Sequence, residues 1–297
     1  MKKKLMTMLL VVATFIMVAC TPAVEAKYQP THFDPSGDLD YDVEEILDER
    51  ITTIIKNELE YINQKYSVDL LLPEYKVYKV VEPTDKDTMV RAETHNGNIY
   101  LYPLYFVSPS SSAEDIAHEA VHLLYHSNYG YDTYFAKNAA GDHSFYGIFF
   151  EEAYADIISR EFLRECYPDE YISPKPAYWV YVSQVESLDV ALGEATASYF
   201  IRNDYEGFSR QINDLAETKG QKLGEDTAQL FAALFDKTMY RTTTMAGLPD
   251  QNFFAENMRF IARCTAEDKL SMLGDVIANN GITLQGGSVA DLAKPIS

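Results

Sequence analysis

The sequence predicts an α+β fold, with a small, mostly antiparallel sheet packed on a helix and an all-helical C-terminal half. Two patterns predict it. Between residues 75 and 102, short runs rich in β-branched and aromatic residues are separated by turn residues, which is typical of strands. After residue 145, apolar residues recur at helical spacing almost to the end of the chain. Strands and helices are therefore expected in different parts of the sequence.

The N-terminal segment has the layout of an export signal. Three lysines, Lys2 to Lys4, precede an apolar run from Leu5 to Val18, which ends in Met17-Val18-Ala19-Cys20. This pattern resembles a bacterial lipoprotein signal peptide over residues 1–19. The resemblance implies cleavage before Cys20, lipid on that cysteine, and an extracytoplasmic location at the cell membrane.

The rest of the chain divides by composition and periodicity. Residues 20–41 contain three prolines, a glycine and several acids, so we expect a flexible tether. We expect an α+β N-terminal subdomain at residues 42–145, a helical C-terminal subdomain at 146–280, and a loose tail at 281–297.

Apolar periodicity predicts the individual elements. Residues 42–66 read as an amphipathic helix, and strands are expected at 75–81, 89–93 and 99–102. A helix is expected from about residue 113, ending at Asn128 or Gly130. Further helices are expected at 146–166, 177–202, 205–217, 225–237, 250–263 and 266–279, with Gly193 as a weak interruption. Whether Cys166 and Cys264 form a disulfide is left open by the sequence.

The helix expected from residue 113 contains the most informative motif, His118-Glu119-Ala120-Val121-His122. Residues four apart lie on one helical face, so His118 and His122 can hold a single metal ion. Imidazole suits zinc. Glu119 lies about 100° further round the helix. There it can act as a catalytic base for a water activated by the metal.

A catalytic zinc site needs a third protein ligand. The best candidate is Glu152, in Phe150-Glu151-Glu152-Ala153-Tyr154-Ala155-Asp156. Asp156 shares its helical face and can accept a hydrogen bond from the far ring nitrogen of a ligating histidine. Glu151 is the competing ligand, although it points about 100° away.

These motifs together resemble the gluzincin metallopeptidases, the group that includes thermolysin. The resemblance covers about residues 95–165. It implies a zincin-like fold and a zinc ion held by His118, His122 and Glu152. It also implies that Glu119 serves as general base and then as proton donor, and that Asp156 lies behind a histidine.

The resemblance implies two further elements. In gluzincins, an edge strand before the motif helix binds extended substrate by backbone pairing, and residues 99–102 occupy that place. A plain core strand is an equal alternative. A histidine or tyrosine also stabilises the oxyanion in these families. The candidates are Tyr181, Tyr199, Tyr205 and His143, although His143 also suits a helix cap or loop.

His126 follows His122 by one turn and is expected at a solvated helix end. His95 is expected in the turn before residues 99–102.

The chain is acidic, with a formal net charge of −20. Loss of residues 1–19, which hold three lysines and no acids, would lower it to −23. Such a charge opposes nucleic-acid binding, which needs a basic surface. The expected partners are therefore a peptide or protein substrate and a membrane reached through the lipid anchor. The alternatives are a catalytically silent zincin-fold lipoprotein that acts as a binding protein, and an accidental motif.

Overall fold

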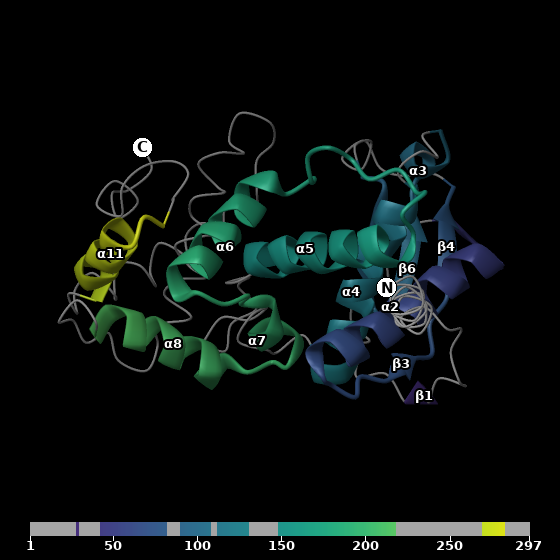
Figure 1. Ribbon diagram of the computed structural model, residues 1–297. Helices are drawn as coiled ribbons and strands as arrows, with labels where there is room; N and C mark the ends of the chain where they lie inside the picture. The colour runs from purple at the N-terminus through teal and green to yellow at the C-terminus, as the bar shows by residue number, and fades with distance from the viewer. Residues whose placement is uncertain are drawn as a thin grey trace, which may run out of the picture. The chain divides into compact units, whose positions relative to one another are not determined.

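The fold is given by a computed structural model, which describes residues 28–29, 42–81, 90–107, 112–130, 148–217 and 269–282. It is an α+β structure, mostly helical, with a small mixed four-stranded sheet (Figure 1). The expected signal peptide with Cys20, almost all of the tether, the helices at 225–237 and 250–263, Cys264 and the tail beyond residue 282 lie outside the described residues. No described helix is both long enough and apolar enough to span a bilayer.

The chain forms two compact units. Unit 1 comprises Met1–Gly130 and Ile158–Pro174, and unit 2 comprises Tyr131–Ile157 and Lys175–Ser297. Helix α5 (Ile148–Cys166) is unbroken and belongs to unit 2 by its first part and to unit 1 by its second.

The sheet of unit 1 has the strand order β2-β4-β6-β5. Its strands are β2 (Val43–Glu45), β4 (Val77–Val80), β5 (Ala92–His95) and β6 (Asn98–Leu101). β4 and β6 run parallel and the other two pairings are antiparallel, so the sheet is mixed. Asn96 and Gly97 join β5 to β6 with φ of 45° and 73°, as a two-residue hairpin turn requires. A separate parallel pair joins β1 (Tyr28–Gln29) to β3 (Leu72–Pro73).

The first helix begins later than predicted. Helix α2 spans Glu49–Tyr66, because the Asp48 side chain accepts hydrogen bonds from the backbone N–H groups of Arg50 and Ile51 and caps it. The helix was predicted to begin at residue 42, but Val43–Glu45, in its predicted first turn, form strand β2 instead. Leu47, which fits the helical periodicity, is 94% exposed, so that apolar spacing does not mark a buried face.

Helix α4 (Ser112–Tyr129) forms the centre of unit 1. It packs against α2 and against β3, β5 and β6. Its fully buried apolar residues include Ile116, Ala117, Ala120, Leu123 and Leu124. Gly130 follows the helix with φ of 78°. A short helix that the sequence did not predict, α3 (Pro103–Val107), precedes α4.

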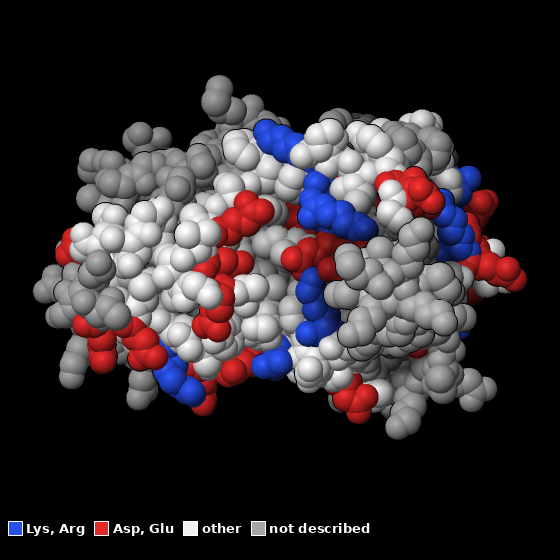
Figure 2. Space-filling view, viewed as in Figure 1, with Lys and Arg blue, Asp and Glu red and all other residues white. Residues whose placement is uncertain are grey.

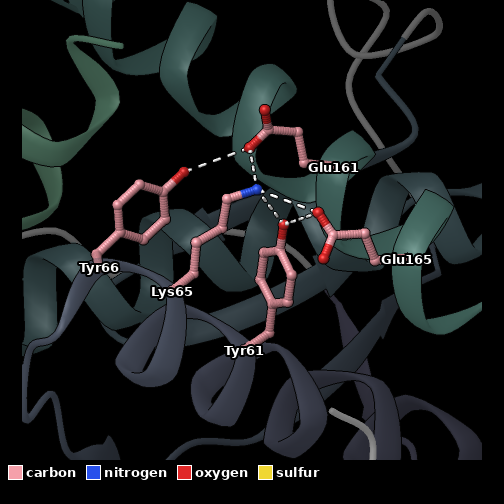
Figure 3. A network of polar contacts seen from close by, with 5 residues as sticks. All are labelled: Tyr61, Lys65, Tyr66, Glu161 and Glu165. Carbon is pink, nitrogen blue, oxygen red and sulfur yellow. Dashed lines mark hydrogen bonds and ion pairs between the residues drawn. The ribbon is translucent and has the colours of Figure 1, made fainter. Parts of the chain in front are cut away.

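A polar network joins α2 to the second part of α5 (Figure 3). Lys65 Nζ donates to the Tyr61 hydroxyl at 2.6 Å, to Glu161 at 2.9 Å and to Glu165 at 3.2 Å. The Tyr61 hydroxyl donates to Glu165 at 3.0 Å, and Tyr66 adds a longer contact to Glu161. These contacts fix α5 against α2 within unit 1.

A buried ion pair joins α4 to the same part of α5. Arg160 donates to Glu114, and both side chains are nearly enclosed. Arg160 also donates to the backbone oxygen of Ser173 at 2.7 Å, while the Ser173 N–H donates to Glu114 at 3.0 Å. Each buried polar group is therefore satisfied, as a buried ion pair requires.

Unit 2 is helical over its described residues. Besides the start of α5 it contains α6 (Trp179–Leu192), α7 (Ala197–Ile201), α8 (Tyr205–Glu217) and α11 (Lys269–Asn279). The single helix predicted at 177–202 is wrong, because α6 ends at Gly193 with φ of 75°. Asp189 accepts hydrogen bonds from the Thr196 backbone N–H and hydroxyl and fixes the break.

Candidate metal centre

Helix α4 presents two histidines to one point. The Nε2 atoms of His118 and His122 lie 3.1 Å apart, and each residue is 8% exposed. Two nitrogens bonded to a tetrahedral zinc at about 2.1 Å stand roughly 3.4 Å apart. The pair therefore has nearly the spacing that one ion requires, as the i and i+4 positions predict.

Helix α5 carries the candidate third ligand, Glu152. One ligand atom each of His118, His122 and Glu152 lie within 4.8 Å of one another. Glu152 lies on the same helix as Glu161 and Glu165, which Figure 3 shows, nine residues before the first of them. Two imidazoles and a carboxylate are a donor set that suits zinc. The structure thus brings together the three side chains that the sequence predicted as ligands.

A second group overlaps the first. His122, His126 and Glu151 also place one ligand atom each within 4.8 Å of one another. His126 is 7% exposed and stacks on His122 with ring centroids 6.3 Å apart, so the expectation of a solvated helix end is wrong. The reason is the packing around α4, which buries the helix as far as Ser127. The spacing of His126 from His122, again four residues, is the sequence signal that could have identified it.

Glu119 belongs to neither ligand group among the described residues. It is 8% exposed, and its backbone oxygen accepts a hydrogen bond from the Thr94 hydroxyl at 2.8 Å. That bond ties the motif helix to β5. Its role as the catalytic base beside an ion stays a prediction.

Asp156 is buried on α5. Its Oδ2 atom accepts a hydrogen bond from the backbone N–H of Tyr178 at 2.9 Å, directly before α6. This hydrogen bond satisfies Oδ2 and holds the Asp156 side chain in one rotamer. The bond predicted from a histidine ring to Asp156 stays a prediction.

Glu58 was missed by the sequence analysis. It lies on the buried face of α2 and is fully buried, and neither carboxylate oxygen has a hydrogen-bond partner in the described part of the chain. Burial raises the pKa of Glu58 well above its usual range, and the charge of His118 acts in the opposite direction. The signal was present in the sequence, because Glu58 occupies a core position of an apolar stripe that includes Ile54 and Ile62.

The strand proposed to bind substrate is not at an edge. β6 lies between β4 and β5, so residues 99–102 are interior and that expectation is wrong. The outer strand beside α4 is β5, which carries Thr94 and ends at His95. His95 therefore belongs to a strand, and its ring contacts Tyr100. Strand order depends on long-range pairing, which the local pattern of residues 99–102 does not contain.

The oxyanion candidates are not resolved by the geometry. Tyr181 is fully buried, and its ring stacks on Tyr178. The Tyr199 hydroxyl donates to Glu194 at 2.9 Å. Burial, followed by this hydrogen bond, raises the pKa of Tyr199 to about 12. Tyr205 begins α8, and His143 lies outside the described residues. All of these residues belong to unit 2.

Comparisons with family models, curated proteins and solved structures found no match to this chain. On the face drawn in Figure 2, acidic side chains are spread over the described surface, with Lys and Arg scattered among them. No large basic patch is seen there, in keeping with the acidic composition.

Proposed function

We propose that this protein is a zinc metallopeptidase of the gluzincin type, with a zincin-like fold, held outside the cytoplasm by a lipid on Cys20. The observation that supports it best is the convergence of His118, His122 and Glu152 within 4.8 Å. A zinc ion bound there would act as a Lewis acid and lower the pKa of a water molecule.

The chain's own residues supply the remaining chemistry. Glu119 accepts a proton from the attacking water and delivers it to the nitrogen of the departing amine. Thr94 holds β5 to the backbone of Glu119 at 2.8 Å. β5 can therefore align an extended peptide beside the base by backbone pairing.

Metal analysis of the purified chain tests the ligand set. We expect one zinc ion per chain, lost in His118→Ala, His122→Ala and Glu152→Gln. Glu151→Gln is the matched control, because it makes the same chemical change at the neighbouring position. Zinc retained in Glu152→Gln and lost in Glu151→Gln would place the ion in the overlapping group instead.

Peptide hydrolysis at equal zinc content tests the reaction. Glu119→Gln should keep zinc and lose about 10²–10⁴-fold in rate, the usual contribution of a general base. Glu44→Gln, at an exposed position of β2, should cleave at the wild-type rate. Equal rates in wild type and Glu119→Gln would refute the mechanism. A zinc-loaded wild type that cleaves nothing in a broad peptide library would instead indicate a silent binding protein.

A further inference from the structure

The second ligand group, formed by His122, His126 and Glu151, is more enclosed than the first. All three of its side chains are buried, whereas Glu152 of the first group is half-buried. Neither His126 nor Glu151 has a role in the proposed peptidase. Two buried imidazoles beside a buried carboxylate are nevertheless a donor set that suits a divalent transition metal.

The surroundings of His126 favour a ligating ring nitrogen. Its Nδ1 atom lies 3.5 Å from the backbone oxygen of Gly130, the residue directly after α4. A proton on Nδ1 that is donated to this oxygen leaves the lone pair on Nε2. Ligating histidines usually donate their other ring nitrogen to a carbonyl or a carboxylate in this way. The contact therefore suits a histidine that binds a metal through Nε2.

His122 belongs to both groups, which limits them to one ion at a time. A neutral imidazole has a lone pair on only one of its two nitrogens, so His122 can bind one ion. The ring centroids of His122 and His126 are 6.3 Å apart, against 4.9 Å for His118 and His122. The histidines of the second group must therefore approach one another further to bind an ion, and we expect a lower affinity there.

We propose that His122, His126 and Glu151 form a second, weaker position for a divalent transition metal, which is filled in place of the first and never together with it. The inference goes beyond the proposed peptidase and does not rest on peptide cleavage. It predicts that an added ion binds at the second position when the first has lost a ligand. A purified variant without added metal should remain empty, because the second position is the weaker one.

The test removes the first position and measures which residues still bind zinc. Zinc is added to metal-free variants, and its affinity is measured by competition with a chromophoric chelator. His118→Ala should bind one zinc ion, more weakly than wild type. A further His126→Ala change should lower this affinity by at least about 10–100-fold, which is the effect of losing even an outer partner of a ligand. Adding Glu151→Gln to His118→Ala should cost as much, and it keeps the size of the buried side chain if the alanine variant does not fold.

The matched control is His118→Ala with His95→Ala, which removes a histidine of β5 that is in neither ligand group among the described residues. It should bind zinc as His118→Ala does. Equal affinities in His118→Ala and in both double variants at the second position would overturn the proposal. Wild type in excess zinc should still hold one ion, and a second ion that disappears in His126→Ala would overturn the sharing of His122. Wild type that binds no zinc would refute both positions, and zinc binding without peptide cleavage would refute only the peptidase.

Discussion

Replacement of Glu114 by glutamine should greatly destabilise the fold. Glu114 accepts hydrogen bonds from Arg160 and from the Ser173 N–H, and its side chain is 12% exposed against 6% for Arg160. Glutamine keeps the size of the side chain and removes its charge. The Arg160 guanidinium then remains buried without its counter-ion, and breaking a buried pair in this way costs about 3–5 kcal/mol. That is a large part of the roughly 5–15 kcal/mol by which a folded protein is stable.

The measurement is urea unfolding followed by circular dichroism. With a slope of about 1–3 kcal/mol per molar urea, the loss should move the midpoint by at least roughly 1 M. Glu170→Gln is the matched control, since Glu170 pairs with Arg50 at 2.7 Å while their side chains are 32% and 53% exposed. An exposed pair contributes about 0–1 kcal/mol. Equal losses in the two variants would refute the claim that burial makes the Glu114 pair different.

The double variant Glu114→Leu with Arg160→Met removes both charges and keeps the space between α4 and α5 filled by side chains. Replacement of both partners by apolar residues leaves no unpaired charge, so the double variant should be more stable than Glu114→Gln. A double variant less stable than Glu114→Gln would show that the hydrogen bonds to Ser173 carry the stability.

Three further outcomes are expected. Cys20→Ser should abolish lipid attachment and membrane retention, as shown by detergent partitioning and mass spectrometry; a wild-type protein that begins at another residue would contradict this. Ile62→Ala should cost about 2–5 kcal/mol in urea unfolding, because Ile62 is fully buried on α2. Tyr61 and Tyr66 have a raised pKa, chiefly because burial disfavours the ionised phenol. Their contribution to stability is therefore full below about pH 10 and is lost as the pH rises toward their folded-state pKa. An absorbance titration should show them ionising at higher pH than free tyrosine.

Much of the site could be predicted because its geometry is local. His118 and His122 are related by helical spacing alone, and their 3.1 Å approach follows from positions i and i+4. Glu152 was harder to predict as a ligand, since its distance from the histidines depends on tertiary structure and not on helical spacing. The sequence supplied its residue type and its spacing from Asp156, but a local pattern does not contain what the helix packs against.

The errors have a common cause in long-range structure. Residues 43–47 have helical apolar spacing, yet Val43 pairs with Val80 in the sheet and Leu47 is exposed. Residues 99–102 form a strand, but their place inside the sheet depends on β4 and β5 pairing on either side. His126 was expected in solvent because it follows the motif by one turn. In each case the local pattern was correctly described, and a distant segment determined what it packs against.

Three acids of unit 1, Glu58, Glu114 and Asp115, have different environments that the sequence does not show. Glu114 is neutralised by Arg160, and Asp115 receives Arg91 at 2.8 Å, so the fold explains both charges. Glu58 has no such partner in the described residues, and burial raises its pKa well above the usual range. A composition or motif search treats these acids alike. Their environments differ, because Glu114 and Asp115 form ion pairs, whereas Glu58 is buried without one in the described residues. Of these three acids, Glu58 is therefore the one whose burial no ion pair in the described residues explains.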